Sequence, residues 1–111
     1  MDIMEERHGG AVLLTVKGRL DSITSPALEE KLLALLNVNV RQFVLNFSAL
    51  EYISSSGLRV LLMVAKKLRP VEGVLALCGL QDHIREVLDL AGFSPLFPIH
   101  DSQEAALKHL T

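Results

Sequence analysis

The fold is decided by residues 43–68, FVLNFSALEYISSSGLRVLLMVAKKL, which pass from a strand pattern into a helix pattern. Residues 43–47 form a short, mostly apolar run, as expected for a strand in the middle of a sheet. Serine is a preferred residue at helix N-termini, so we expect a helix to begin near Ser55. Apolar residues then recur at helical spacing. This passage from strand to helix indicates an α/β fold.

The sequence before this stretch predicts a hairpin followed by a helix. Residues 3–7 are a weak edge strand, and residues 11–16 are an apolar second strand. Between them, Gly9-Gly10 can adopt the positive φ angles of a tight turn. We expect a loop over residues 17–24. We then expect a helix from Ser25-Pro26 to about Asn37, because Ser can cap a helix and Pro suits its first turn.

The sequence after this stretch predicts one more clear strand and two helices. Residues 74–78 are an apolar run typical of a buried strand. Helix patterns follow at about residues 82–91 and 102–110, and the Gly- and Pro-containing segment between them leaves room for a short last strand. We therefore expect an α/β domain over residues 1–111. Its mixed sheet should have four or five strands, with parallel pairing beyond the hairpin and about four helices packed on it.

Composition excludes several functional classes. The chain has 111 residues, 11 Lys+Arg, 13 Asp+Glu and a formal net charge of -2. No basic run could follow a nucleic-acid backbone, so no nucleic-acid partner is expected. No apolar stretch has the roughly 18 to 20 residues that a membrane span needs, and residues 1–7 lack a signal-peptide pattern. We expect a cytoplasmic protein without membrane insertion, in which Cys78 is a buried structural thiol.

The helix after Ser55 has two predicted faces. The core side is expected to comprise Leu58, Leu61, Leu62, Ala65 and Leu68. The outward side is expected to comprise Ser56, Val60, Met63 and Lys67. Two outward residues are apolar, which suggests a partner surface, although single exposed apolar residues are also common.

Three consecutive serines before Gly57 have a structural and a regulatory interpretation. One serine can cap the helix, and the other two exceed that need. Gly57 suits close packing at the helix start. Asp21, in the earlier loop, could be a loop cap or turn former near the first helix.

Catalysis, metal binding and cofactor binding are not expected. Residues 54–57 lack the first glycine of a nucleophile elbow. The four histidines share no motif with one another, and no metal-ligand spacing or glycine-rich phosphate loop occurs. These histidines are His8, His83, His100 and His109.

Two segments resemble the STAS-domain anti-sigma factor antagonists. Phe47-Ser48 followed by residues 52–58, YISSSGL, is similar to the signature of that family, and residues 18–21, GRLD, with Thr24 are similar to its early loop. The resemblance implies a non-enzymatic partner switch. In that scheme the unphosphorylated antagonist binds an anti-sigma factor that is itself a serine kinase, which frees a sigma factor for transcription. Phosphorylation of the motif serine breaks the complex, and a serine phosphatase could reverse it.

Alignment on Gly57 places the phosphoacceptor at Ser55, with Ser54 and Ser56 as alternatives. The resemblance and the helical pattern together predict a partner-binding surface, with Val60, Met63 and Lys67 contributed by the pattern. Its residues are Asp21, Thr24, Ser54, Ser55, Ser56, Gly57, Val60, Met63 and Lys67. Many such proteins have acidic residues where this chain has Asn46 and Ser54. This departure keeps open an alternative, a constitutive STAS scaffold or subunit of a signalling or lipid-transport assembly.

Overall fold

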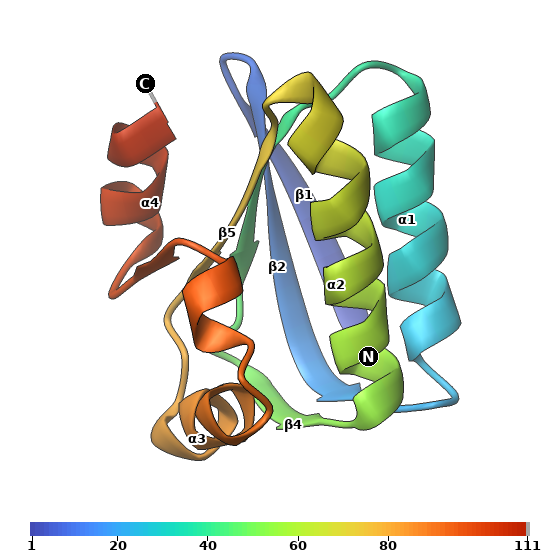
Figure 1. Ribbon diagram of the computed structural model, residues 1–111, viewed down its shortest axis with the longest axis vertical. Coiled ribbons are helices and arrows are strands. Elements are labelled where there is room, and N and C mark those ends of the chain that lie inside the picture. Colours follow the sequence, from blue (N-terminus) through green and yellow to red (C-terminus); the bar gives the residue numbers. More distant parts are fainter. Residues whose placement is uncertain (111) are drawn as a thin grey trace.

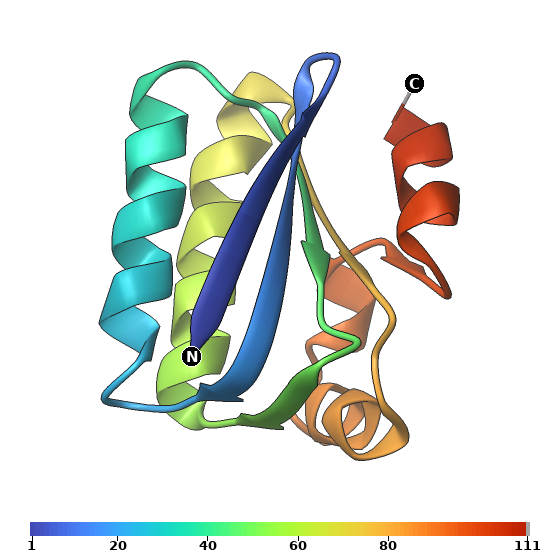
Figure 2. The ribbon, with the colours of Figure 1, turned by 180° about the vertical axis from the view of Figure 1, so that it is seen from behind.

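A twisted mixed sheet has helices α1 and α2 on one face and α4 on the other (Figures 1 and 2). The computed structural model describes residues 1–110, so Thr111, the last residue of the expected domain, lies outside the described residues. The strands are β1 Asp2–His8, β2 Ala11–Leu20, β3 Gln42–Asn46, β4 Leu50–Ile53, β5 Val74–Cys78 and β6 Ile99–His100. The helices are α1 Ser25–Asn37, α2 Ser55–Leu68, α3 Asp82–Leu90 and α4 Gln103–Leu110, with short 3-10 turns at Arg69–Val71 and Ser94–Leu96.

The sheet has the order β1-β2-β3-β5-β6. β1 and β2 form the expected antiparallel hairpin, and Gly9 turns between them with a φ of 63°. The other pairs are parallel, as expected for strands joined through helices. The α/β class, the mixed sheet and the four helices are therefore confirmed.

The predicted loop over residues 17–24 was wrong in its first half. β2 continues to Leu20 and pairs there with β4, a strand the sequence analysis did not identify. This adds a sixth strand to the expected four or five. The register shifts between Gly18 and Arg19, and Gly18 has a φ of 105°. A bulge of this kind bends the strand and interrupts its alternation, which hid the continuation.

The two faces of the sheet bury cores of different size. The larger core lies between the sheet and helices α1, α2 and α3, and includes Phe43, Phe47 and Leu61. The smaller one lies under α4, where Ala106 meets residues of β2, β3 and β5. Cys78 belongs to this smaller core, as expected, and burial raises the pKa of its thiol to about 11. Within residues 1–110, the helices are too short or too polar to cross a membrane.

The predicted faces of α2 were wrong by roughly a quarter turn. Val60, expected to face outward, is 1% exposed. The buried face comprises Gly57, Val60, Leu61, Val64 and Leu68. Leu58 and Ala65, expected in the core, are half-buried and pack against its edge, whereas Leu62 is half-buried beside the hollow on the outer side. The reason is that all residues from Leu58 to Ala65 except Arg59 are apolar, so spacing alone does not select one stripe.

Candidate functional site

The candidate site lies where β2 and β4 end side by side (Figure 1). β2 leads through a short loop into α1, and β4 leads through Ser54 into α2. The Ser54 backbone N–H donates to the carbonyl of Leu20 at 2.9 Å, which joins the two strand ends. Residues from two distant parts of the sequence therefore meet at the N-terminus of α2.

The three serines occupy different environments. Ser54 is the N-cap of α2, and its Oγ accepts a hydrogen bond from the backbone N–H of Gly57 at 3.4 Å. Ser55 is the first residue of the helix and is exposed, whereas Ser56 is half-buried. Within residues 1–110, neither a histidine nor a carboxylate hydrogen-bonds these hydroxyls. The arrangement presents Ser55 as an accessible hydroxyl without an adjacent general base.

Gly57 allows the start of α2 to approach the strand ends closely. A Cβ at this position would lie 2.9 Å from Cγ1 of Ile53 and 2.9 Å from Cγ of Leu20. Both neighbours are buried core residues with little freedom to move. The close-packing role expected for Gly57 is therefore confirmed.

The loop from Asp21 to Thr24 is held by its own hydrogen bonds. The Asp21 carboxylate accepts from the backbone N–H groups of Ile23 at 3.0 Å and Thr24 at 3.1 Å. The Thr24 hydroxyl accepts from the Asp21 backbone N–H at 2.9 Å and donates to the carbonyl of Arg19 at 2.7 Å. The backbone N–H of Thr24, followed by that of Ile23, the Thr24 hydroxyl and the charge of Arg19, lowers the pKa of the Asp21 carboxyl. These hydrogen bonds confirm the structural role predicted for Asp21, that of a turn former.

The start of α1 differs in detail from the prediction. Thr24, not Ser25, is the N-cap residue, and Pro26 lies in the first turn as expected. Ser25 is buried, and its hydroxyl has no hydrogen-bond partner within the described part of the chain. The Thr24 hydroxyl serves the loop and does not cap the helix.

Three further residues beside the site were not identified from the sequence. Ile23 is 86% exposed at the tip of the loop. The guanidinium of Arg19 lies 4.3 Å from the ring centre of Tyr52, and its Nε is 3.8 Å from the Asp21 carboxylate. An isoleucine between polar loop residues was the available signal for Ile23. The pairing of Arg19 with Tyr52 depends on β4, which was not predicted.

The exposed side of α2 continues from Ser55 along the helix. A shallow hollow of about 330 Å³ is lined by Arg59, Leu62, Met63, Lys66 and Lys67. A second hollow of about 550 Å³ lies between α1 and α2, and Arg59 lines this one too. Lys67 is thus on the outer side as expected, Met63 lines the hollow but also packs against the larger core, and Val60 is buried. The surface combines half-buried apolar groups with positive charge.

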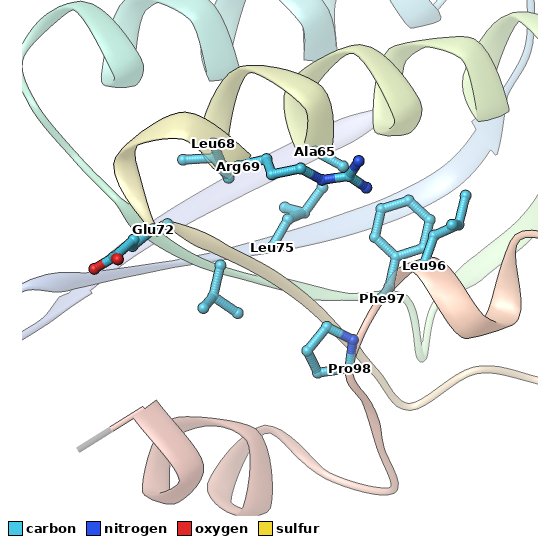
Figure 3. Close-up of a pocket in the computed structure, with 10 residues that line it drawn as sticks. Ala65, Leu68, Arg69, Glu72, Leu75, Leu96, Phe97 and Pro98 are labelled. Atoms are coloured by element: carbon cyan, nitrogen blue, oxygen red, sulfur yellow. The ribbon is translucent and has the colours of Figure 1, made fainter.

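A separate cleft lies at the other end of α2 (Figure 3). It has a volume of about 300 Å³ and is lined mainly by apolar residues, among them Leu68, Leu75 and Phe97. In the close-up, Arg69 extends over the cleft towards Phe97, and Glu72 points away from it. This cleft is near the C-terminus of α2, so it is not part of the serine site.

Asn46 has a structural role away from the three serines. Its side-chain N–H donates to Oε1 of Gln103 in α4 at 2.9 Å, and its oxygen accepts from the Ser48 backbone N–H at 2.9 Å. The amide thus joins the end of β3 to α4. A carboxylate at this position could not donate to Gln103.

Comparisons with known proteins agree with this geometry. The STAS domain family model matches residues 2–106. BtrV of Bordetella bronchiseptica, named as a candidate anti-sigma factor antagonist, is 42% identical over 106 residues, covering 96% of this chain and 91% of its own. An anti-sigma factor antagonist structure from Mycobacterium paratuberculosis is 28% identical with a TM-score of 0.88, covering 97% of this chain and 92% of its own.

The phosphorylated form of SpoIIAA from Bacillus shares the fold. It superposes with a TM-score of 0.80 at 21% identity, covering 99% of this chain and all of its own. The matches therefore extend over nearly the whole length of this chain and of these proteins. The chain belongs to the STAS-domain family of anti-sigma factor antagonists.

Proposed function

We propose that this protein is a phosphorylation-controlled partner switch. In its unmodified form it binds an anti-sigma factor and thereby frees a sigma factor for transcription. The anti-sigma factor has serine kinase activity and phosphorylates Ser55, which ends the complex. A serine phosphatase restores the binding form. The exchange takes place in the cytoplasm, and this protein contributes a surface and a substrate hydroxyl without catalysing a reaction.

The observation that supports this proposal most strongly is the difference between the three serines. Ser54 is occupied as the helix cap, and Ser56 is half-buried. Ser55 is exposed at the first helical position, where a kinase can reach its hydroxyl. It also follows Ser54, whose backbone N–H is bonded to the end of β2 just before Asp21.

The binding surface follows from the corrected orientation of α2. It comprises Asp21, Thr24, Ser55, Ser56, Met63 and Lys67 from the original prediction. Leu62 joins this surface, because it is half-buried on the outer side, and Val60 leaves it. Ser54 and Gly57 contribute indirectly, by holding the start of α2 in position: Ser54 caps the helix and Gly57 is buried.

Phosphorylation can block binding without unfolding the protein. A phosphate adds about -1.5 to -2 charges at pH 7. At the N-terminus of a helix it meets free backbone N–H groups and the favourable end of the helix dipole. On the partner side, the same charge repels acidic groups and makes burial of Leu62 and Met63 against the partner less favourable. The expected change is therefore local.

The test begins with the isolation of the partner from a lysate of the native organism, followed by purification of both proteins. Ser55→Asp should weaken the complex at least about tenfold in calorimetry, because a like charge opposes an acidic contact. Ser55→Asn, which has nearly the same shape without the charge, is the matched control and should bind close to the parent protein.

A phosphotransfer assay with the partner and ATP identifies the acceptor. Ser55→Ala should abolish incorporation of phosphate, whereas Ser56→Ala should retain it. If Ser55→Asp binds as tightly as Ser55→Asn, and no serine is labelled, partner switching is wrong. The protein would then be a constitutive subunit.

A further inference from the structure

Arg59 lies one helical turn after Ser55 on the exposed side of α2. The helix is continuous from Ser55 to Leu68, so these two residues are four positions apart on one face. Side chains at this spacing have Cβ atoms about 5–6 Å apart. Long side chains in a helix also lean towards its N-terminus, over residues three and four positions earlier. Rotamers of Arg59 that bring its guanidinium to a phosphate on Ser55 are therefore among the favoured ones.

Arg59 is also uncommitted in the unmodified protein. Within residues 1–110 it forms no hydrogen bond or ion pair, whereas Arg19 pairs with Asp21. Glu29 and Glu30 of α1 line the same hollow as Arg59, but neither carboxylate lies within 4.0 Å of it. The Arg59 guanidinium is thus available to a new anionic partner, one helical turn after the exposed Ser55 hydroxyl.

We propose that Arg59 is the intramolecular receptor for a phosphate on Ser55. The inference rests on the proposed function only in taking Ser55 as the phosphorylated residue. Guanidinium groups bind phosphate through two parallel hydrogen bonds. An acidic group four residues before a basic one is the favoured order in a helix, since it agrees with the helix dipole.

This pairing gives phosphorylation a second effect on the binding surface. Arg59 lines both the hollow on the outer side of α2 and the hollow between α1 and α2. When it binds the phosphate, its guanidinium moves towards the N-terminus of α2 and its charge is neutralised. An acidic partner then meets a new negative charge and also loses a positive one.

The test uses the full chain with phosphoserine installed at position 55 during translation, so that no kinase is needed. A 31P NMR titration measures the second pKa of the phosphate, ordinarily about 6. A nearby cation favours the dianion and lowers this pKa. Arg59→Gln should therefore raise it by about 0.5 relative to the phosphorylated parent, and Arg59→Lys should give a smaller rise.

Lys66→Gln is the matched control. Lys66 is exposed on the same helix, eleven residues after Ser55 and roughly 16 Å along the axis, beyond the range of unscreened attraction. This variant should leave the phosphate pKa within about 0.1 of the parent. If Arg59→Gln shifts the phosphate pKa no more than Lys66→Gln does, Arg59 does not bind the phosphate.

The same phosphorylated protein separates this proposal from the proposed function. If it binds the purified anti-sigma factor as tightly as the unmodified protein, partner switching fails whatever Arg59 does. If the complex is lost but the phosphate titrates identically with arginine and glutamine at position 59, partner switching stands and the Arg59 proposal alone fails.

Discussion

The two faces of α2 differ in their surroundings. One face is buried against the sheet and comprises Gly57, Val60, Leu61, Val64 and Leu68. The other face is accessible and comprises Ser55, Arg59, Leu62, Met63, Lys66 and Lys67. Apolar residues occur on both. The charged residues lie on the accessible face, but Leu62 is also there, so hydropathy alone does not identify the buried side of the helix.

This comparison separates stability from recognition within one helix. A substitution on the buried face changes packing and should alter the free energy of unfolding. A substitution on the accessible face leaves the core intact and should alter binding instead. The following variants test this separation, from the largest expected change in stability to the smallest.

Val60→Asp should have the largest effect. Val60 is 1% exposed, and an unpaired carboxylate in the core is strongly unfavourable. We expect a loss of more than about 4 kcal/mol of unfolding free energy, a large part of the total for a domain of this size. The measurement is urea denaturation followed by circular dichroism. Leu62→Asp, on the other face, should lose less than about 1 kcal/mol, and equal losses would contradict the observed orientation of the helix.

Gly57→Val should have the next largest effect. Its added atoms would meet Leu20 and Ile53 at the start of α2, where even a Cβ would be too close. Overpacking of this kind costs about 2–3 kcal/mol. The stability of Gly57→Ala should lie between that of Gly57→Val and that of the parent. The methyl group also clashes, but alanine has a higher helix propensity than glycine, which offsets part of this cost. If both variants are as stable as the parent in the same denaturation assay, Leu20 and Ile53 can move to accommodate the added atoms without a measurable cost.

Ser54→Ala should have a smaller effect. It removes the oxygen that accepts from the Gly57 N–H, a cap that contributes about 0.5–1 kcal/mol. The hydrogen-bond distance of 3.4 Å favours the lower end of this range. Ser55→Ala, which removes no cap, should stay within about 0.3 kcal/mol of the parent. The reverse order of the two variants would mean that Ser55 caps the helix.

Ser55→Asp should have the smallest effect on stability. A negative charge at the first helical position is favoured by the helix dipole, so the unfolding free energy should rise by up to about 0.5 kcal/mol. Thermal melting would show a shift of a few degrees at most. Ser55→Asn serves as the uncharged control. A sharp fall in Tm for the aspartate variant alone would indicate that phosphorylation acts by disrupting the fold.

The local parts of the fold were predictable from the sequence. The start of α2 at Ser55 and the bounds of β5 at residues 74–78 agree with the expected positions, because cap residues and apolar runs act over a few neighbouring residues. β4 was not predictable in this way. It has only four residues, two of them exposed, and it pairs with the bulged end of β2.

The candidate site was predictable in its centre but not at its borders. The serine run and Gly57 were identified as a set, and their distinct environments follow from the cap geometry. The facing side of α2 and the contact of Arg19 with Tyr52 required the three-dimensional structure. Both depend on how the elements pack, and the unbroken apolar run over residues 60–65 of α2 leaves that choice open in the sequence.

β1 forms an outer edge of the sheet and has consequences for aggregation. An exposed strand edge is a template on which a second chain can add by backbone hydrogen bonds. In β1 this edge bears charged side chains, with Glu5 paired to Arg7 and Lys31, and Glu6 close to His8. Bringing two such edges together would bury these charges. β1 can therefore close one side of the sheet while discouraging edge-to-edge association when the protein accumulates.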